Sequence, residues 1–544
     1  MTRKVVLPAW CGLLALVVLF PLLGRGFVLS YDMVFAPSQS LLPESVGAGS
    51  TPARSVPADA VVALVTGLLP GDVVQKVLLA AALFLGPWGS GRLVPTESLG
   101  TRLVAATAYG WTPYVAERLF MGHWPYLLAY ACLPWIAAAG LAVRAGEPKS
   151  LARLVLWMAP AVLTPTGGLL AAGTALAACG RRRAGWVVAA AVGVNLPWLV
   201  PSVLRSGAVL SAPQAVELFA AKGENWAGVV VSVLGLGGYW NADVVPASRG
   251  LPLVPVLTVA VVAVALVAFP RLVRSWGVGL VALGGLGVVF ALLAHLPFGR
   301  VALEWAVASV PGAALSRDAQ KWVAWWALPL AVGFALGVEA LARAHKAVVA
   351  VAVALPVVAM PDLAWGGWGR LDTVQYPADW ARVRAVLADD PRSGDVLALP
   401  LGAFRRFEWN GDRTQLDPAP RVLPRTVVVD DTVHVSGVPV PGEDTRMPGV
   451  RAALRDGSLG AVGVGWVLVE HGTPGDVPDL SGLDEVFAGP WLTLYRVPGD
   501  VATPAPEGLG WIVAGDVVAV LILAGFVLWQ RLPTGRLLFH RREE

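Results

Sequence analysis

Long apolar runs separated by short polar segments dominate this chain of 544 residues, and basic residues stand at the ends of many runs. The hydrocarbon core of a bilayer needs a helix of about 20 apolar residues to cross it. Many of the runs reach this length, so we expect a polytopic α-helical membrane protein. The predicted spans are 8–24, 73–90, 100–116, 124–143, 184–204, 251–270, 277–296, 322–342, 347–361 and 510–530.

A further apolar stretch, residues 151–183, is interrupted at its centre by TPTGG, which begins at Thr164. Basic residues flank both of its ends, and such residues favour the cytoplasmic side of a membrane. We therefore expect two short helices that fold back at the Pro/Gly break. Breaks at membrane depth are tolerated where protein or a cavity covers them. Counted as two crossings, the pair brings the total to about 12 transmembrane helices.

The basic clusters place both termini in the cytoplasm, including the basic tail GRLLFHRREE. The N-terminal run resembles a signal peptide but lacks a clear small-residue cleavage site, so we interpret it as an uncleaved first span. Four segments then lie outside: a long first loop at 25–72, and 205–250, 297–321 and 362–508. Within the second, WAGVVVSVLGLGGYW is expected to be re-entrant or interfacial.

The composition changes abruptly after residue 361. Residues 362–508 carry alternating apolar runs such as RTVVVDD and GWVLVEHG, two helical stretches, and frequent Gly and Pro. These patterns predict short strands and turns. We expect a small extracytoplasmic α/β domain between a membrane domain, 1–361, and a final span with its cytoplasmic tail, 509–544.

Composition supports a membrane protein and excludes several function classes. Mean hydropathy is +0.65 and 14% of residues are charged, against about 25% in soluble domains. The net charge of +4 is small, and its placement fits membrane orientation rather than nucleic-acid binding. The cysteines fall in apolar runs without metal or disulfide spacing. The chain also lacks P-loop, HExxH and GxSxG motifs, so nothing supports ATP-driven transport.

Polar residues at two predicted outer boundaries are candidates for chemistry. Asp32 follows the first span, and its loop continues with Arg54 and Asp59. Ionisable groups beside a membrane are costly unless they face a cavity or find partners, although Asp32 is equally interpretable as a solvated loop acid. Near the second boundary, Arg118 suits phosphate binding and His123 suits proton or hydrogen-bond donation. The alternative is that Arg118, His123 and Trp124 anchor the chain at the membrane interface.

A third cluster, Arg317, Asp318 and Lys321, precedes a span. On a helix, Arg317 and Lys321 would share one face and repel each other unless an anion lay between them. The alternatives are snorkelling to lipid headgroups and a phosphate held between the two cations.

An aromatic and cationic stretch, GAFRRFEWN, lies in the predicted α/β domain. Its aromatic rings suit either sugar stacking or ordinary strand packing, and packing is the favoured interpretation because aromatic side chains commonly fill cores. The residues concerned are Phe404, Arg405, Phe407 and Trp409.

The order of these features resembles a known superfamily. The chain begins with a first span and a long outer loop that carries an early Asp. The stretches that follow, in order, are RLFMGHWPYLLAYACLPW, TPTGG, GLGGYWN and SRDAQKWVAWWALPLAVGFALGVE. The chain closes with GWVLVEHG and LTLYRV. Together they resemble the GT-C polyprenyl-phosphosugar glycosyltransferases, with the alpha-(1→3)-arabinofuranosyltransferase family and its polytopic membrane relatives as the nearest branch.

The resemblance implies an inverting glycosyltransferase in a bacterial plasma membrane. It would move a sugar, arabinofuranose in that branch, from a polyprenyl-phosphate donor to an envelope polysaccharide or glycolipid acceptor at the extracytoplasmic face. Asp32 would serve as general base or as a metal ligand, with Asp59 as a second acid. The implied substrate-binding residues are Arg54, Arg118, His123, Trp124, Arg317, Asp318 and Lys321.

Two points stay open at this stage. The first loop has no DxD or paired DE motif, so the need for a divalent cation is undecided. Two other classes of function also remain: a non-enzymatic protein that binds or assembles an envelope glycolipid, and a lipid-linked sugar transporter. The chain lacks the repeated halves that many transporters show.

Overall fold

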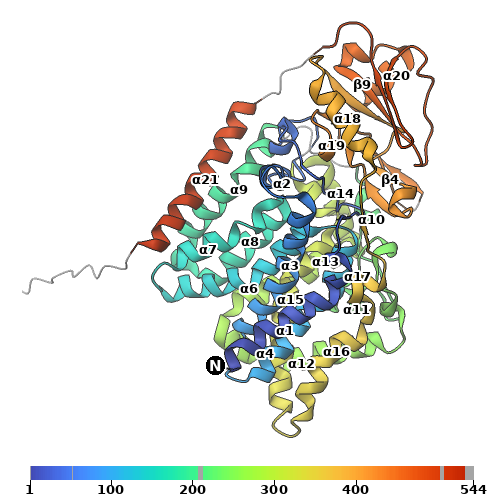
Figure 1. Cartoon of the computed structure of the whole chain (residues 1–544). Helices are drawn as coiled ribbons and strands as arrows, with labels where there is room; N and C mark the ends of the chain where they lie inside the picture. Colours follow the sequence, from blue (N-terminus) through green and yellow to red (C-terminus); the bar gives the residue numbers. More distant parts are fainter. Residues whose placement is uncertain (1, 52, 206–211, 436, 503–507, 533–544) are drawn as a thin grey trace, which may run out of the picture.

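The computed structural model describes residues 2–51, 53–205, 212–435, 437–502 and 508–532, so the predicted basic tail lies outside the described residues. Helices make up most of the chain, with a small sheet-containing unit at one end (Figure 1). The long helices are α1 (Thr2–Leu19), α3 (Gly71–Leu93), α6 (Trp124–Ala145), α9 (Ala184–Leu204), α12 (Val254–Trp276), α13 (Val278–Leu292), α15 (Ala324–Leu341) and α21 (Leu509–Arg531).

The protein is a multi-pass membrane protein. Within the described ranges, eight helices are long and apolar enough to cross a bilayer. The number is nine if α16 (Ala347–Ala359) and the bent segment Pro361–Trp368 form one span. This is fewer than the 12 predicted, because three predicted crossings are shorter helices: α4 (Leu99–Gly110), α7 (Ser150–Met158) and α8 (Pro165–Cys179).

The break predicted at TPTGG is present between α7 and α8. The Thr164 side chain caps α8 by accepting a hydrogen bond from the Gly167 backbone N–H at 3.0 Å, as Thr commonly does at a helix start. A Cβ on Gly167 would overlap the Ala161 carbonyl oxygen, and one on Gly168 would overlap Asn195. The glycines therefore allow the hairpin to pack closely against its own turn and against α9.

The most enclosed span is Ala319–Leu341, which contains α15 and is 83% buried, against 17% for α21. It packs against α12, α13 and α4. In Figure 1, α21 lies along α9 at the edge of the bundle. The core that positions the polar residues described below is therefore built around α15, α6 and α3.

The sheet-containing unit has a five-stranded mixed sheet of order β10-β11-β9-β3-β6. Its strands are β3 (Asp395–Leu399), β6 (Val427–Val428), β9 (Val464–Glu470), β10 (Asp484–Ala488) and β11 (Leu492–Arg496). Neighbours β6, β3 and β9 are parallel, whereas β9, β11 and β10 are antiparallel. Separate apolar clusters, which include residues of α18 (Ala378–Asp389) and of α20 (Met447–Asp456), pack against it.

The loop after the first helix is bound to this unit by backbone pairing. Strand β1 (Phe27–Val28) pairs antiparallel with β2 (Thr373–Val374). Tyr31 donates its backbone N–H to the Thr414 carbonyl at 2.6 Å, in the hairpin of β4 (Phe404–Arg406) and β5 (Thr414–Leu416). Residues 25–70 and the sheet-containing unit therefore lie on the same face of the helical bundle.

Candidate active site

A cavity of about 1110 Å³ lies between the helical bundle and the sheet-containing unit. Its walls come from the first loop, the corner between α5 (Pro113–Phe120) and α6, the α7–α8 break, the segment 239–243, the segment 314–321 and the sheet-containing unit. All the predicted site residues except Arg118 line it: Asp32, Arg54, Asp59, His123, Trp124, Arg317, Asp318 and Lys321.

Asp32 is held against the α5–α6 corner by backbone contacts. Its N–H donates to the Met121 carbonyl at 3.0 Å. Gly122 has a positive φ of 78°, and a Cβ there would overlap the Met33 backbone nitrogen and the Ser30 carbonyl oxygen. Glycine is the residue that satisfies both constraints. Gly122 of the MGHW sequence therefore allows the Asp32 loop to pack against the α5–α6 corner.

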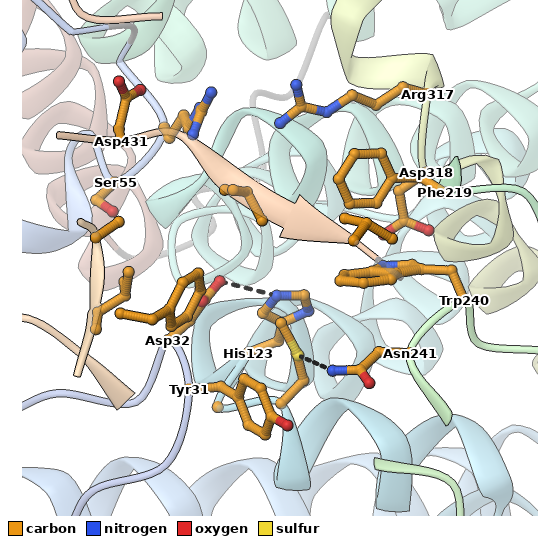
Figure 2. Close-up of a pocket in the computed structure, with 18 of the residues that line it drawn as sticks. Tyr31, Asp32, Ser55, His123, Phe219, Trp240, Asn241, Arg317, Asp318 and Asp431 are labelled. Atoms are coloured by element: carbon orange, nitrogen blue, oxygen red, sulfur yellow. Dashed lines mark hydrogen bonds and ion pairs between the residues drawn. The ribbon is translucent and has the colours of Figure 1, made fainter. Parts of the chain in front are cut away.

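The Asp32 carboxylate faces the His123 imidazole, and both side chains line the cavity (Figure 2). His123 Nε2 lies 3.0 Å from Asp32 Oδ2, and His123 Nδ1 lies 3.2 Å from Arg118 Nη1. The Asp32 side chain is 38% exposed and that of His123 is 11% exposed. The carboxylate is thus oriented by one hydrogen bond and still open to the cavity.

Arg118 lies behind the cavity wall instead of lining it. Its side chain is fully buried, Nη1 donates to Asp318 Oδ2 at 3.1 Å, and Nη2 donates to Gln320. The guanidinium also lies over the Tyr239 ring, 4.4 Å from its centroid. The phosphate-binding role expected for Arg118 therefore does not match its position, because a ligand in the cavity would not reach it.

Arg54 and Arg317 share a partner that sequence reasoning missed. The Glu443 carboxylate, from the sheet-containing unit, lies 2.5 Å from Arg54 Nη2 and 2.8 Å from Arg317 Nη1. Burial alone would raise the pKa of Glu443, but the two guanidiniums hold that pKa below its ordinary value. The available signal was weak, since Glu443 follows Arg317 by 126 positions in a loop without a motif.

Lys321 is differently placed from Arg317. The two were expected on one helix face, but Arg317 follows the 3₁₀ turn Ala313–Ser316 and Lys321 lies in a second turn, Ala319–Val323. Lys321 is 5% exposed. Across the part of the chain that the structure describes, no carboxylate lies within ion-pair distance of its ammonium group. It is a buried cation that lines the cavity without a paired anion.

Asp59 and Trp124 have structural contacts. Asp59 lies in the first turn of α2 (Ala58–Thr66), and its Oδ1 accepts from Arg421 Nε at 3.2 Å. This ion pair joins the first loop to the sheet-containing unit. The Trp124 ring packs against Phe35 with centroids 5.3 Å apart. Both residues also line the cavity.

The residues of GAFRRFEWN divide between core and cavity. Phe407 and Trp409 stack at 5.0 Å in the core of the sheet-containing unit, which confirms the packing interpretation for them. Arg405 is buried in an ion pair with Asp417 at 2.8 Å and with Glu470. Phe404 is different, since it lines the cavity with Tyr31, its edge-to-face partner at 6.2 Å.

A second aromatic pair on the cavity wall was not predicted. Phe219 and Trp240 meet edge to face at 4.7 Å, beside Arg317 and Asp318 (Figure 2). Trp240 belongs to GLGGYWN, which the sequence analysis singled out as part of a resemblance and of a re-entrant or interfacial segment, not as a binding surface. The cavity therefore offers aromatic surfaces together with carboxylates and cations, the combination that binds sugars and phosphates.

The residues do not fit a resident metal ion. Among the described side chains, no group of three or more His, Cys, Asp and Glu is arranged to hold one. Asp32 Oδ2 and His123 Nε2 face each other in a hydrogen bond, so these atoms are engaged with each other. The proposal below therefore routes no step through a divalent cation.

Comparison with solved structures identifies the fold. The chain superimposes on the single-particle cryo-EM structure of arabinofuranosyltransferase AftD from Mycobacteria with a TM-score of 0.54 and 17% identity, over 92% of this chain and 40% of AftD. A mutant AftD structure gives 0.55 and 16%, over 92% and 42%. No protein-family model and no curated protein matches the sequence.

The likeness shows that this chain shares the fold of the AftD structures over 92% of its length. The chain spans about two fifths of the length of the AftD chains that it matches. At this level of identity the comparison supports the fold alone. The chemistry has to be argued from the residues of the site.

Proposed function

We propose that this protein is a membrane glycosyltransferase that transfers a sugar from a polyprenyl-phosphate donor to an envelope glycan or glycolipid. The observation that carries the proposal is the cavity itself. Its lining includes an oriented, accessible carboxylate, Asp32, a buried cation, Lys321, that has no ion-pair partner among the described residues, and several aromatic side chains. The AftD fold supports this proposal, and arabinofuranose is the sugar that the likeness suggests.

In the proposed reaction, the acceptor hydroxyl attacks the anomeric carbon of the donor. Asp32 takes the hydroxyl proton, the new glycosidic bond forms, and the bond between the anomeric carbon and the phosphate oxygen breaks. Polyprenyl phosphate leaves with the electron pair, and a single displacement of this kind inverts the anomeric centre. General-base assistance of this type is typically worth about 10²–10⁴-fold in rate.

Lys321 would stabilise the charge that develops on the leaving phosphate. The phosphate gains negative charge as its bond to the sugar breaks, and a preplaced cation in a poorly solvated site stabilises such charge strongly. Asp318 stays engaged with Arg118, so it would shape the pocket without contacting the phosphate directly. Tyr31, Phe404, Phe219 and Trp240 would stack against sugar rings of the donor and acceptor.

The isoprenoid tail requires an apolar surface on the helical bundle. A slot of about 110 Å³ lies between α12, α15 and α16, and apolar side chains such as Leu330, Phe334 and Leu355 form most of its lining. We place part of the tail against these helices. Burying an apolar chain contributes about 0.8 kcal/mol per CH₂ group, so the tail would supply much of the donor affinity.

We also place the cavity on the extracytoplasmic side of a bacterial plasma membrane. The first loop and the sheet-containing unit share one face, and the basic clusters at Arg144–Arg153 and at 181–183 mark the opposite one. Both termini would then be cytoplasmic. In this orientation, donor and acceptor would meet outside the cell.

The test is transfer by the purified protein in sealed vesicles, with a synthetic polyprenyl-phosphosugar and a glycan acceptor. We expect Asp32→Asn to lower transfer by at least about 100-fold. The matched control is Asp243→Asn, another carboxylate that lines the cavity but accepts from the Tyr31 hydroxyl at 3.3 Å. Transfer by Asp32→Asn at the wild-type rate would remove the proposal, and an acceptor that reacts only from the cytoplasmic side would reverse the orientation.

A further inference from the structure

His123 lies between two groups of opposite hydrogen-bonding character. Arg118 Nη1 is 3.2 Å from its Nδ1, and Asp32 Oδ2 is 3.0 Å from its Nε2. A guanidinium can only donate hydrogen bonds and an ionised carboxylate can only accept them. Nδ1 must therefore carry its lone pair toward Arg118, and Nε2 must carry a hydrogen toward Asp32.

Arg118 is held in this position from several sides. Asp318 and Gln320 accept from its two terminal nitrogens. Gln320 is itself fixed, because its amide donates to the Gly237 carbonyl at 3.1 Å. The Tyr239 ring covers one face of the guanidinium at 4.4 Å. With so many fixed contacts, Arg118 cannot turn away to let Nδ1 accept a proton.

We infer that Arg118 is a positioning residue that fixes His123 as the neutral Nε2–H tautomer, and that His123 thereby orients Asp32 as the base. The inference rests on the proposed function for the role of Asp32. Neither imidazole nitrogen is free to take the acceptor proton, since one faces Arg118 and the other faces Asp32. One oxygen of Asp32 is committed to His123, and the other remains to receive the proton.

Among the described residues, Arg118 and Asp32 are the charged groups that contact the imidazole. Arg118 faces it from α5, Asp32 from the first loop, Tyr126 from α6 with ring centroids 4.9 Å apart, and Tyr239 edge to face at 6.3 Å. Asp318 reaches His123 only through Arg118.

The direct test is nitrogen NMR of the full-length protein in nanodiscs, with ¹⁵N-labelled histidine. The chain has six histidines, and the resonances of His123 are assigned as those missing from His123→Gln. We expect a protonated Nε2 and a bare Nδ1. A protonated Nδ1 would overturn the inference.

Variants extend the test to activity. The Gln side-chain amide lies near the position of Nε2 and the Asn amide near that of Nδ1, so His123→Gln should keep the donor to Asp32 whereas His123→Asn should lose it. We expect His123→Gln to transfer at least about tenfold faster than His123→Asn. Equal rates for the two variants would contradict the positioning role.

Arg118→Leu supplies a second spectroscopic readout. Without the guanidinium, no donor fixes the lone pair on Nδ1, so a protonated Nδ1 should become detectable in the nitrogen spectrum of this variant. If this variant does not fold, the wild-type spectrum and the two His123 variants still decide the question. The NMR result does not depend on transfer, so a neutral Nε2–H imidazole in an inactive protein would retain the role of Arg118 in fixing the tautomer and reject the proposed function, and with it the role of Asp32 as base.

Discussion

At the scale of single residues, the charged side chains of the site differ in how deeply they are buried, and their proposed roles differ accordingly. The sequence identified most of the charged side chains that line the cavity, because acids and cations beside apolar runs need partners or a cavity. It did not separate Arg118, which is fully buried, from Lys321, which lines the cavity. That distinction depends on how α5 and the 3₁₀ turn at 319–323 pack, which no local pattern specifies.

In the proposed reaction, the positive charge of Lys321 binds the phosphate of the donor. Lys321→Met keeps the apolar stem and removes the ammonium group. Hydrogen bonds to charged groups are worth about 1.5–3 kcal/mol, which corresponds to about 10- to 150-fold in affinity. We expect polyprenyl phosphate to bind that much more weakly, as measured by calorimetry in nanodiscs. The control is Lys76→Met, which removes a lysine that pairs with Asp72; equal losses for both variants would show that Lys321 has no specific role.

At the scale of elements, the sequence predicted what local chemistry determines. The TPTGG break between α7 and α8 was predictable because Pro and Gly end helices and Thr caps the next one. Pairing between distant segments was not predictable, because β1 meets β2 across more than 340 positions of chain. The shared helix face considered for Arg317 and Lys321 does not form, because the chain there makes two 3₁₀ turns.

The segment around Glu443 links the sheet-containing unit to the first loop and to the turn at Arg317. Glu443→Gln removes the negative charge with which Arg54 and Arg317 form ion pairs at pH 7. Losing these contacts should cost about 2 kcal/mol and increase amide hydrogen exchange in residues 437–446. The control is Glu485→Gln on the exposed strand β10. Unchanged exchange in Glu443→Gln would show that the contact does not hold the two parts together.

The same contact has a defined pH dependence. Because the folded-state pKa of Glu443 is below its ordinary value, its ionised form stabilises the protein above the unfolded pKa. That contribution is lost as the pH falls through the folded pKa. Acidification below about pH 4 should therefore raise exchange in residues 437–446 of the wild type toward the level of Glu443→Gln, whereas the variant should change little.

At the scale of the whole molecule, the helical bundle and the sheet-containing unit each supply part of one cavity. The sequence predicted both parts from hydropathy and from the change in composition after residue 361. It could not predict that the second covers the polar end of the first, since that arrangement rests on long-range contacts such as Asp59 with Arg421. The AftD likeness extends over 92% of the chain and so includes both parts.

The central claim is that this cavity holds the phosphate of a polyprenyl donor beside Asp32. The most direct measurement is a cryo-EM structure of the full chain in nanodiscs with polyprenyl phosphate. The account predicts phosphate density within hydrogen-bonding distance of the Lys321 ammonium group, on the cavity side of the Asp32 carboxylate. Phosphate density outside the cavity, with Lys321 and Asp32 uncontacted, would contradict it.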